Sequence, residues 1–382
     1  MELAAFGVAA GAFVLALIFT PLVRAAALKL NFVDKPGERK IHDREIAYGG
    51  GIAVAISVAL IVFAAVPLLK EHLPRPATDD LALKTILVVA AGSFGALLLG
   101  LYDDKMKLSP YAKLAGQLVL AIGAVAGGVR ITALVGDNLL MQAVTVLWIV
   151  LITNSFNLLD NMDGLCSGTV AIAAGVLAIV TIDSGQWTLA LGLSALGGAC
   201  FGFLRFNRAP ASIFLGDAGS LFVGFLMACF TVLATYYRYR EPSHLAVGIP
   251  ILVLAIPLYD TLSVIVIRLR EKRPIMRGDT SHFSHRLVDL GMTRRQAVMT
   301  IHLACLAIGL PATVLGQLSE PRGFLIIGQA VLVLTIVALL EHAGRTRARE
   351  MKSAAASSGP APSVDAAHSR ETAASTRPED PA

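Results

Sequence analysis

Four polar side chains recur at every third position along one apolar stretch of the sequence. They are Asn154, Asn157, Asp160 and Asp163. Residues three apart on a helix lie on one face, so this spacing predicts a row of amide and carboxylate groups. Oxygen atoms of these groups are the ligands that Mg²⁺ prefers in proteins. Because such groups are costly in apolar surroundings, the row indicates a functional site rather than packing.

Two adjacent carboxylates, Asp103 and Asp104, end another apolar stretch, and Lys113 begins the next one. Anionic side chains at the C-terminus of a helix oppose the helix dipole, so a simple helix-ending turn explains them poorly. Adjacent aspartates suit a bound cation, or a base whose pKa is tuned by its neighbour. The ammonium of Lys113 could hold a phosphate.

Two basic loops carry side chains suited to anionic ligands. The first contains Arg39 and His42 and leads into the glycines at 49–51, where the backbone could approach a phosphate. The second contains His282, His285 and Arg286, a combination suited to a pyrophosphate. A solvated basic loop is the alternative interpretation of each.

A further polar group, Asp217, stands three residues after Phe214 at the start of an apolar stretch. Taken alone, Asp217 is explained as an ordinary helix N-cap. Next to the row that begins at Asn154, a metal ligand is the better interpretation.

Membrane helices must position these residues. Of the 382 residues, 55% are hydrophobic and 15% are charged, and the mean hydropathy is +0.70. In a soluble domain about a quarter of the residues are charged, so a soluble enzyme and a disordered chain are both excluded. A run of about 20 apolar residues spans a bilayer. We therefore expect an all-α polytopic membrane protein with about eleven transmembrane helices, at 4–23, 47–69, 82–101, 113–129, 140–158, 165–182, 188–204, 216–236, 245–267, 298–317 and 323–340.

Basic residues set the expected orientation. The connections after the odd-numbered spans hold 19 Lys and Arg, and the other connections hold seven. The positive-inside rule then places the N-terminus outside and the C-terminus in the cytoplasm, with every polar cluster on the cytoplasmic side. The sequence divides into a transmembrane domain, 1–343, and a tail, 344–382, whose Ala, Ser, Pro and Arg content predicts disorder.

Taken in order, four patterns resemble the polyprenyl-phosphate N-acetylhexosamine-1-phosphate transferases. They are DKPxxRKxH from Asp34, YDD ending at Asp104, NxxNxxDxxDG from Asn154 and GDxGS from Gly216. The resemblance points to the branch of bacterial undecaprenyl-phosphate GlcNAc-1-phosphate transferases. It implies transfer of an N-acetylhexosamine 1-phosphate, with GlcNAc expected, from a UDP-sugar to undecaprenyl phosphate. UMP is released, and the lipid-diphosphate sugar starts a cell-envelope glycan.

The resemblance also implies a role for each matched residue. Asn157 and Asp217 match the ligands of a catalytic Mg²⁺, and Mn²⁺ is the alternative ion. One of the adjacent aspartates is the favoured base, and Phe214 matches an aromatic ring that stacks on uracil. The catalytic set is Asp103, Asp104, Asp160, His282 and His285, and the substrate-binding set is Arg39, His42, Lys113, Asn154, Asp163, Phe214 and Arg286.

One position departs from the family pattern. Ser284 stands where a middle histidine is usual, and Arg286 follows it closely. The lack of three consecutive histidines argues against the translocase that acts on UDP-MurNAc-pentapeptide, which remains the enzyme alternative. A CDP-alcohol phosphotransferase is excluded because Leu165 and Cys166 stand where its pattern needs Ala-Arg.

A membrane transporter is the non-enzymatic alternative, but it would place ionisable residues near the bilayer midplane. The expected partners are the UDP-sugar, the polyprenyl phosphate and the lipid bilayer. No nucleic acid is expected, and a homodimer is left open. The resemblance implies a multi-pass protein of the inner (plasma) membrane with its active site on the cytoplasmic face.

Overall fold

The computed structural model describes residues 1–35, 45–69, 80–131, 138–234, 244–276 and 281–357. In chain order, its helices and strands are α1 (Glu2–Lys29), β1 (Val33–Asp34), β2 (Ile46–Ala47), α2 (Gly50–Leu69), α3 (Asp80–Met106), α4 (Pro110–Ala126), α5 (Leu139–Leu159), α6 (Leu165–Asp183), α7 (Trp187–Asn207), α8 (Gly216–Leu233), η2 (His244–Gly248), α9 (Ile249–Val253), α10 (Ala255–Arg270), α11 (Phe283–Asp289), α12 (Arg294–Ala312), η3 (Leu315–Gln317) and α13 (Glu320–Ser357).

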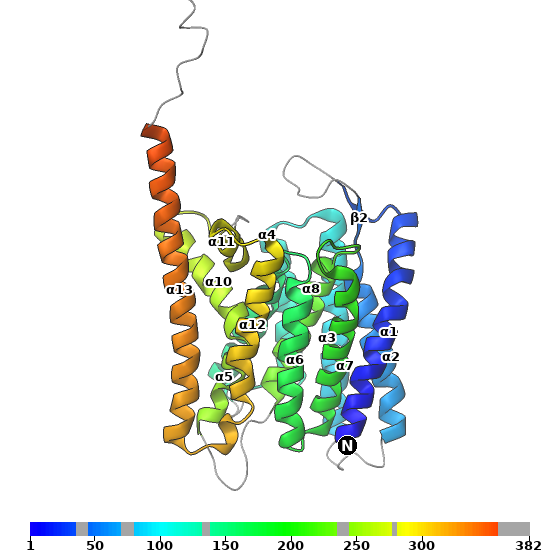
Figure 1. The fold of residues 1–382 in the computed structure, drawn as a ribbon. Helices are drawn as coiled ribbons and strands as arrows, with labels where there is room; N and C mark the ends of the chain where they lie inside the picture. The colour runs from blue at the N-terminus through cyan, green and yellow to red at the C-terminus, as the bar shows by residue number, and fades with distance from the viewer. Residues whose placement is uncertain (36–44, 70–79, 132–137, 235–243, 277–280, 358–382) are drawn as a thin grey trace, which may run out of the picture.

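Helix α8 forms the centre of the bundle and packs against α2, α3 and α5 (Figure 1). Glycines allow the backbones to approach closely there. A Cβ atom on Gly51 of α2 would lie 2.2 Å from the Gly219 nitrogen, and one on Gly100 of α3 would lie 2.2 Å from the Asp217 carbonyl oxygen. Close packing of this kind stabilises helix pairs in a bilayer, where lipid tails compete for every apolar surface.

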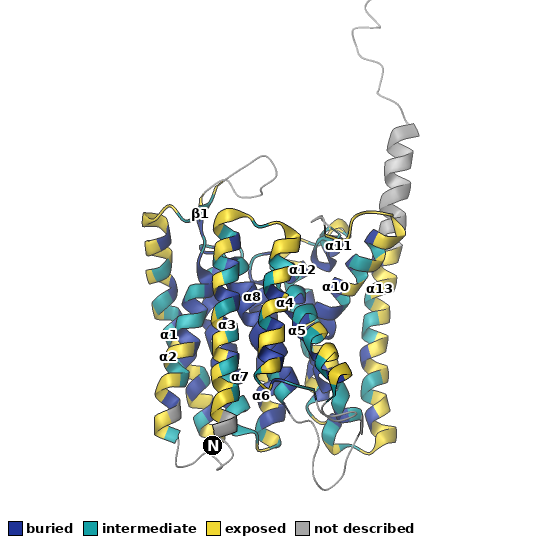
Figure 2. Cartoon of the chain, turned by 180° about the vertical axis from the view of Figure 1, so that it is seen from behind, coloured by how far each residue is buried: buried dark blue, intermediate teal, exposed yellow. Residues whose placement is uncertain are grey.

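The outer helices expose large apolar side chains. Figure 2 shows buried residues gathered around the central helices and exposed residues on the outward faces of α1, α3 and α13. Phe6 of α1 and Phe63 of α2 are 71% and 79% exposed, which suits contact with lipid rather than water. The expectation of an all-α polytopic membrane protein is confirmed.

The expected number of eleven spans is not confirmed. Among the described residues, nine helices are long and apolar enough to cross a membrane, or up to ten if the bent pair formed by α9 and α10 counts as one span. The expected span at 113–129 corresponds to α4, which is only 17 residues long.

The expected span at 245–267 corresponds to the bent pair of α9 and α10 rather than to one straight helix. The helix bends by 72° between α9 and α10, at Leu254. Pro257 explains the bend, because a proline has no N–H to donate and its ring clashes with the carbonyl four residues earlier, that of Val253. The bend matters because α10 carries side chains that face the histidine-containing α11.

The last helix continues beyond the expected start of the tail at 344. Helix α13 ends only at Ser357, and Figure 1 shows it rising past the ends of its neighbours. Ala, Glu, Arg, Lys and Met predominate in this stretch, and all five favour helix. The expectation of disorder stays untested for residues 358–382, which the structure does not describe.

A small hairpin joins the first helices to the centre. Strands β1 and β2 pair antiparallel, with Val33 opposite Ala47, and Ala47 also bridges Ile213. The Phe214 N–H donates to the Ala47 carbonyl at 2.9 Å, and the Gly50 N–H donates to the Phe214 carbonyl at 2.9 Å. These bonds fix the start of α2 beside the start of α8.

Candidate active site

Three of the expected residues meet at the end of α3, α4 and α8. The Lys113 ammonium lies 2.9 Å from Asp103 Oδ2 and 3.0 Å from Asp217 Oδ1. Ser109 caps α4 by accepting from the Ala112 N–H, and Pro110 begins the helix, so Lys113 projects from its first turn. Two carboxylates thus share one cation, an arrangement that leaves net negative charge.

Asp104 has a different environment from its neighbour. Its two carboxylate oxygens accept from the backbone N–H groups of Asp217, at 2.8 Å, and Ala218, at 3.0 Å. Both N–H groups lie in the first turn of α8 and have no acceptor within that helix. A carboxylate at this end is also favoured by the helix dipole. Asp104 therefore caps α8 from another helix, and the N-cap alternative for Asp217 does not hold. Gly216 has a φ of +75°, and a Cβ there would lie 2.8 Å from Asp104 Oδ2.

The row that begins at Asn154 is only partly helical. Helix α5 ends at Leu159, so Asn154 and Asn157 share a helix but Asp160 and Asp163 lie in the turn before α6. The expected row of four along one helix face is therefore wrong. Gly164, with a left-handed φ of +75°, is the N-cap of α6 and turns the chain into that helix.

The turn still places its polar groups around the same centre. Asn157 Nδ2 donates to Asp217 Oδ1 at 2.5 Å and to Ser220 Oγ at 2.8 Å. Asp163 Oδ2 accepts from the Ala211 N–H at 2.9 Å, which ties the turn to the segment before α8. Burial, followed by the negative charge of Asp217, raises the pKa of Asp160 well above its usual range.

Asn154 lies one turn earlier on α5 and bonds to α4. Its Nδ2 donates to the side-chain oxygen of Gln117 and, at 2.9 Å, to the Val150 carbonyl. Gln117 follows Lys113 by one helical turn, so this bond fixes α4 against α5. In the described structure Asn154 orients the helix that carries Lys113.

Phe214 belongs to an aromatic group beside the cluster. Its ring centroid lies 6.1 Å from that of Tyr48, which lies 5.5 Å from that of Phe32. Burial, with the adjacent Asp34 carboxylate, raises the pKa of the Tyr48 phenol. Phe214 is half-buried.

The histidine segment begins with a buried pair. His282 Nδ1 lies 3.0 Å from Asp260 Oδ2 on α10, and the other Asp260 oxygen accepts from the Phe283 N–H at 2.5 Å. This carboxylate fixes the orientation of the imidazole, and Nε2 is the ring nitrogen that does not face Asp260. Burial lowers the pKa of His285, and the neighbouring positive charges of His282 and Arg294 lower it further.

Ser284 connects the histidine segment to the carboxylate centre. Its hydroxyl donates to Asn161 Oδ1 at 2.5 Å, and Asn161 follows Asp160 directly. The residue that departs from the family pattern is therefore a structural link between α11 and the turn after α5.

The structure does not bring Arg286 to this centre. The Arg286 side chain is only 5% exposed and pairs with Glu341 of α13. The expectation that Arg286 binds substrate therefore has no support in its contacts. Arg39 and His42 lie outside the described residues.

The residues present fit a divalent cation. Asp217 offers a carboxylate and Asn157 an amide, and the carboxylates of Asp103 and Asp104 lie beside them. Mg²⁺ is commonly held by one or two carboxylates together with substrate phosphates. In the described ranges no group of three or more His, Cys, Asp and Glu is arranged as a metal site by itself.

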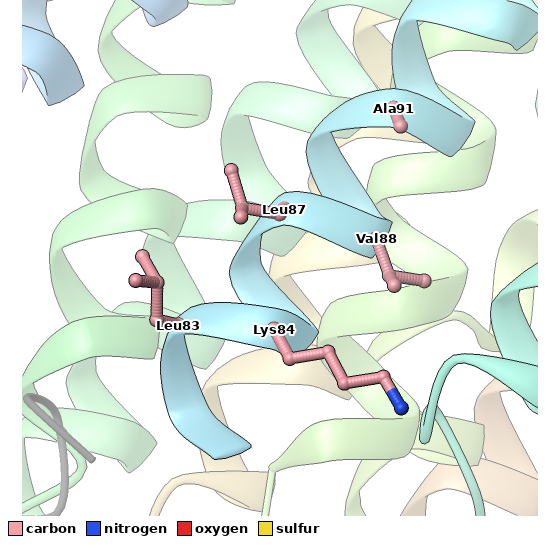
Figure 3. Close-up of a pocket in the computed structure, with 5 residues that line it drawn as sticks. All are labelled: Leu83, Lys84, Leu87, Val88 and Ala91. Atoms are coloured by element: carbon pink, nitrogen blue, oxygen red, sulfur yellow. The ribbon is translucent and has the colours of Figure 1, made fainter. Parts of the chain in front are cut away.

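Two described cavities lie away from this centre. One, of about 370 Å³, follows the first turns of α3 and is lined by Leu83, Lys84, Leu87, Val88 and Ala91 (Figure 3). Since a helix rises 1.5 Å per residue, Ala91 is roughly 18 Å from Asp103. The other, of about 360 Å³, lies between α1, α6 and α7.

Sequence reasoning missed Asp260, Asn161, Gln117 and Glu341. Asp260 and Glu341 each stand in or beside an apolar span, and an isolated charge in that position is itself a signal. Asn161 and Gln117 carry no such signal, because polar uncharged residues near helix ends are ordinary.

Comparison with known proteins adds a family and several relatives. The model described as "Glycosyl transferase family 4" matches residues 86–235. A protein of Bacillus subtilis (strain 168), named as a probable undecaprenyl-phosphate N-acetylglucosaminyl 1-phosphate transferase, is 33% identical over 331 residues, 84% of this chain and 88% of the relative. A decaprenyl-phosphate N-acetylglucosaminephosphotransferase of Mycolicibacterium smegmatis is 32% identical over 375 residues, 89% of each chain.

A third relative has a different named substrate. A phospho-N-acetylmuramoyl-pentapeptide-transferase of Bacillus cytotoxicus is 32% identical over 244 residues. The match covers 58% of this chain and 72% of the relative.

Proposed function

Because the chain belongs to the polyprenyl-phosphate N-acetylhexosamine-1-phosphate transferases, we propose that it transfers GlcNAc-1-phosphate from UDP-GlcNAc to undecaprenyl phosphate. UMP leaves, and the lipid-diphosphate sugar begins a cell-envelope glycan. The names of the relatives that match most of the chain support this donor and a polyprenyl phosphate acceptor. The structural observation that carries the proposal is Lys113 held between Asp103 and Asp217, a cation among carboxylates at the end of three membrane helices.

We place the catalytic Mg²⁺, or Mn²⁺, at Asn157 and Asp217, whose oxygen-bearing side chains suit a hard cation. When bound, such an ion withdraws charge from a diphosphate and makes its phosphorus easier to attack. Lys113 adds a fixed positive charge for the phosphate of the lipid acceptor. Two phosphates that repel each other can then be held together.

The adjacent aspartates take separate tasks in this proposal. Asp104 already accepts two backbone N–H groups and holds the start of α8 in place. Asp103 has one oxygen directed at the Lys113 ammonium, so it is the better candidate for a base at the lipid phosphate. A phosphate is largely ionised at pH 7, so the base need supply only about 10²-fold.

The histidine segment binds the sugar-nucleotide side of the site in this proposal. His282 is oriented by Asp260 and His285 is kept neutral by its surroundings. Phe214 offers its ring to uracil. The site lies on the cytoplasmic face of the inner membrane, with the N-terminus outside, as the distribution of basic residues suggests.

The proposal is tested with purified protein, Mg²⁺, undecaprenyl phosphate and a panel of UDP-sugars. UMP release should be fastest with UDP-GlcNAc, and mass spectrometry of the lipid should show a diphosphate carrying one N-acetylhexosamine. A muramoyl-pentapeptide or a non-acetylated hexose on the lipid would contradict the proposed donor. Loss of turnover on chelation, restored by Mg²⁺, checks the metal.

A further inference from the structure

A buried ion pair joins the histidine segment to the last membrane helix. Arg286 Nε lies 3.0 Å from Glu341 Oε2, and the two residues are 5% and 2% exposed. Arg286 belongs to α11, and Glu341 belongs to α13, which is otherwise a peripheral, lipid-facing helix. Removing two charges from water is costly, and only good pairing offsets that cost.

Further contacts surround both charges. The Tyr259 hydroxyl donates to the same Glu341 oxygen at 3.1 Å. The other guanidinium nitrogens donate to Ser263 Oγ, at 2.8 Å, and to the Ser281 carbonyl, at 2.5 Å. The Arg286 guanidinium also lies 5.9 Å from the centre of the Tyr259 ring. A guanidinium so enclosed cannot bind a substrate phosphate without leaving these partners.

Helix α11, which contains His285, has little stability of its own. Helix α11 is seven residues long, well below the roughly 12–15 residues that form a stable isolated helix. It is therefore held by its tertiary contacts. Asp260 of α10 holds its beginning, Asn161 holds Ser284, and Glu341 of α13 holds Arg286. His282 and His285 lie among these three attachments.

We propose that Glu341 is a positioning residue, which acts through Arg286 to hold His282 and His285 in place for the sugar nucleotide. This rests on the proposed function, and it assigns α13 to the frame of the active site. Arg286 is then a structural partner of Glu341 rather than a substrate ligand. In the proposed function the histidines contact only the sugar nucleotide, so the effect of the pair should be confined to that substrate.

The test compares Michaelis constants in Glu341→Gln, which keeps the size of the side chain but removes its charge. The KM for UDP-GlcNAc should rise by roughly tenfold, because small displacements of binding groups are costly. The KM for undecaprenyl phosphate should stay within about twofold of the wild-type value, since Lys113 and Asp103 are not attached to this pair. Gln329→Ala is the matched control: it removes a polar contact from α13 to the Ala307 carbonyl and should leave both constants unchanged.

A second variant covers the case in which Glu341→Gln does not fold. The double change Arg286→Met with Glu341→Met leaves no unpaired buried charge, so it should fold with a melting temperature near that of the wild type. It should show the same selective rise in the KM for UDP-GlcNAc. Equal Michaelis constants in these variants and the wild type, with only kcat or yield reduced, would overturn the inference. A wild-type protein without turnover would instead refute the proposed function, and the inference with it.

Discussion

The adjacent aspartates show how one position along the chain changes the task of a side chain. Asp103 faces Lys113, whereas Asp104 accepts from the first turn of α8. Both are carboxylates at the end of α3, and their sequence context is the same. Only the structure separates a carboxylate that pairs with a lysine from one that caps a helix.

Replacing each aspartate by asparagine should give different losses. Asp104→Asn puts an NH₂ group opposite a backbone N–H, which should cost about 1–3 kcal/mol of stability and lower the melting temperature. Asp103→Asn keeps its acceptor for the Leu108 N–H, so it should fold normally and lose about 10²-fold in kcat. Thermal melts and turnover of the two purified variants check this. If the two variants lost equal amounts of melting temperature and of kcat, the separate roles of Asp103 and Asp104 would be contradicted.

The pH dependence of the site should reflect a neutral His285. Burial and neighbouring positive charges lower its pKa, so the ring is uncharged at about pH 7 and gains a proton only at lower pH. Activity should therefore be constant from about pH 7 upwards and fall in acid as the ring becomes charged. His285→Gln, which stays neutral, should lose that acid limb while keeping more activity than His285→Ala. An acid limb that persists in His285→Gln would assign it to another group.

At the scale of elements, the sequence predicts the helices better than their ends. Apolar runs locate α1 to α8 because a bilayer selects for length and apolarity. The same rule cannot find the bend at Leu254, which depends on a single Pro. It cannot find the end of α5 at Leu159 either, where the following turn is held by bonds to Ala211 and Asn207. The carboxylate centre was predictable from residue types, but the Asp260 and Glu341 contacts were not, because tertiary packing alone brings them to the histidines.

The close approach of α3 and α8 gives a prediction at this scale. A Cβ on Gly100 would lie 2.2 Å from the Asp217 carbonyl oxygen, so Gly100→Ala must move α3 away from α8. We expect a loss of about 1–3 kcal/mol of stability, as for other overpacked cores. The shift also moves Asp103 and Asp104, so kcat should fall with it.

Gly123→Ala on α4 is the control, because a Cβ there has no neighbour within 4 Å. Alanine favours helix over glycine by roughly 0.5–1 kcal/mol, so this variant should be slightly more stable. The unfolding temperatures of Gly100→Ala and Gly123→Ala in detergent, compared with that of the wild type, measure both changes in stability. A Gly100→Ala variant as stable as Gly123→Ala would contradict the tight contact.

At the scale of the whole molecule, the candidate site lies at one end of the bundle and the N-terminus at the other (Figure 1). The bias of 19 against seven basic residues predicts that the site end is cytoplasmic. A reporter fused after Leu340 should therefore respond as cytoplasmic, and one fused to Met1 as external. The reverse pattern would put the nucleotide site on the wrong side of the membrane.

The cap that Asp104 gives to α8 also bears on how the protein is made. The N–H of Asp217 belongs to a residue 113 positions later in the chain. A ribosome adds about 5–20 residues per second, so α3 waits roughly 6–23 s for its partner. During that interval both carboxylates need water. Their place in the last turn of α3 supplies it, whereas one or two turns deeper in the helix they would face hydrocarbon before α8 existed. The order of translation thus limits how far into the bilayer this carboxylate centre can lie.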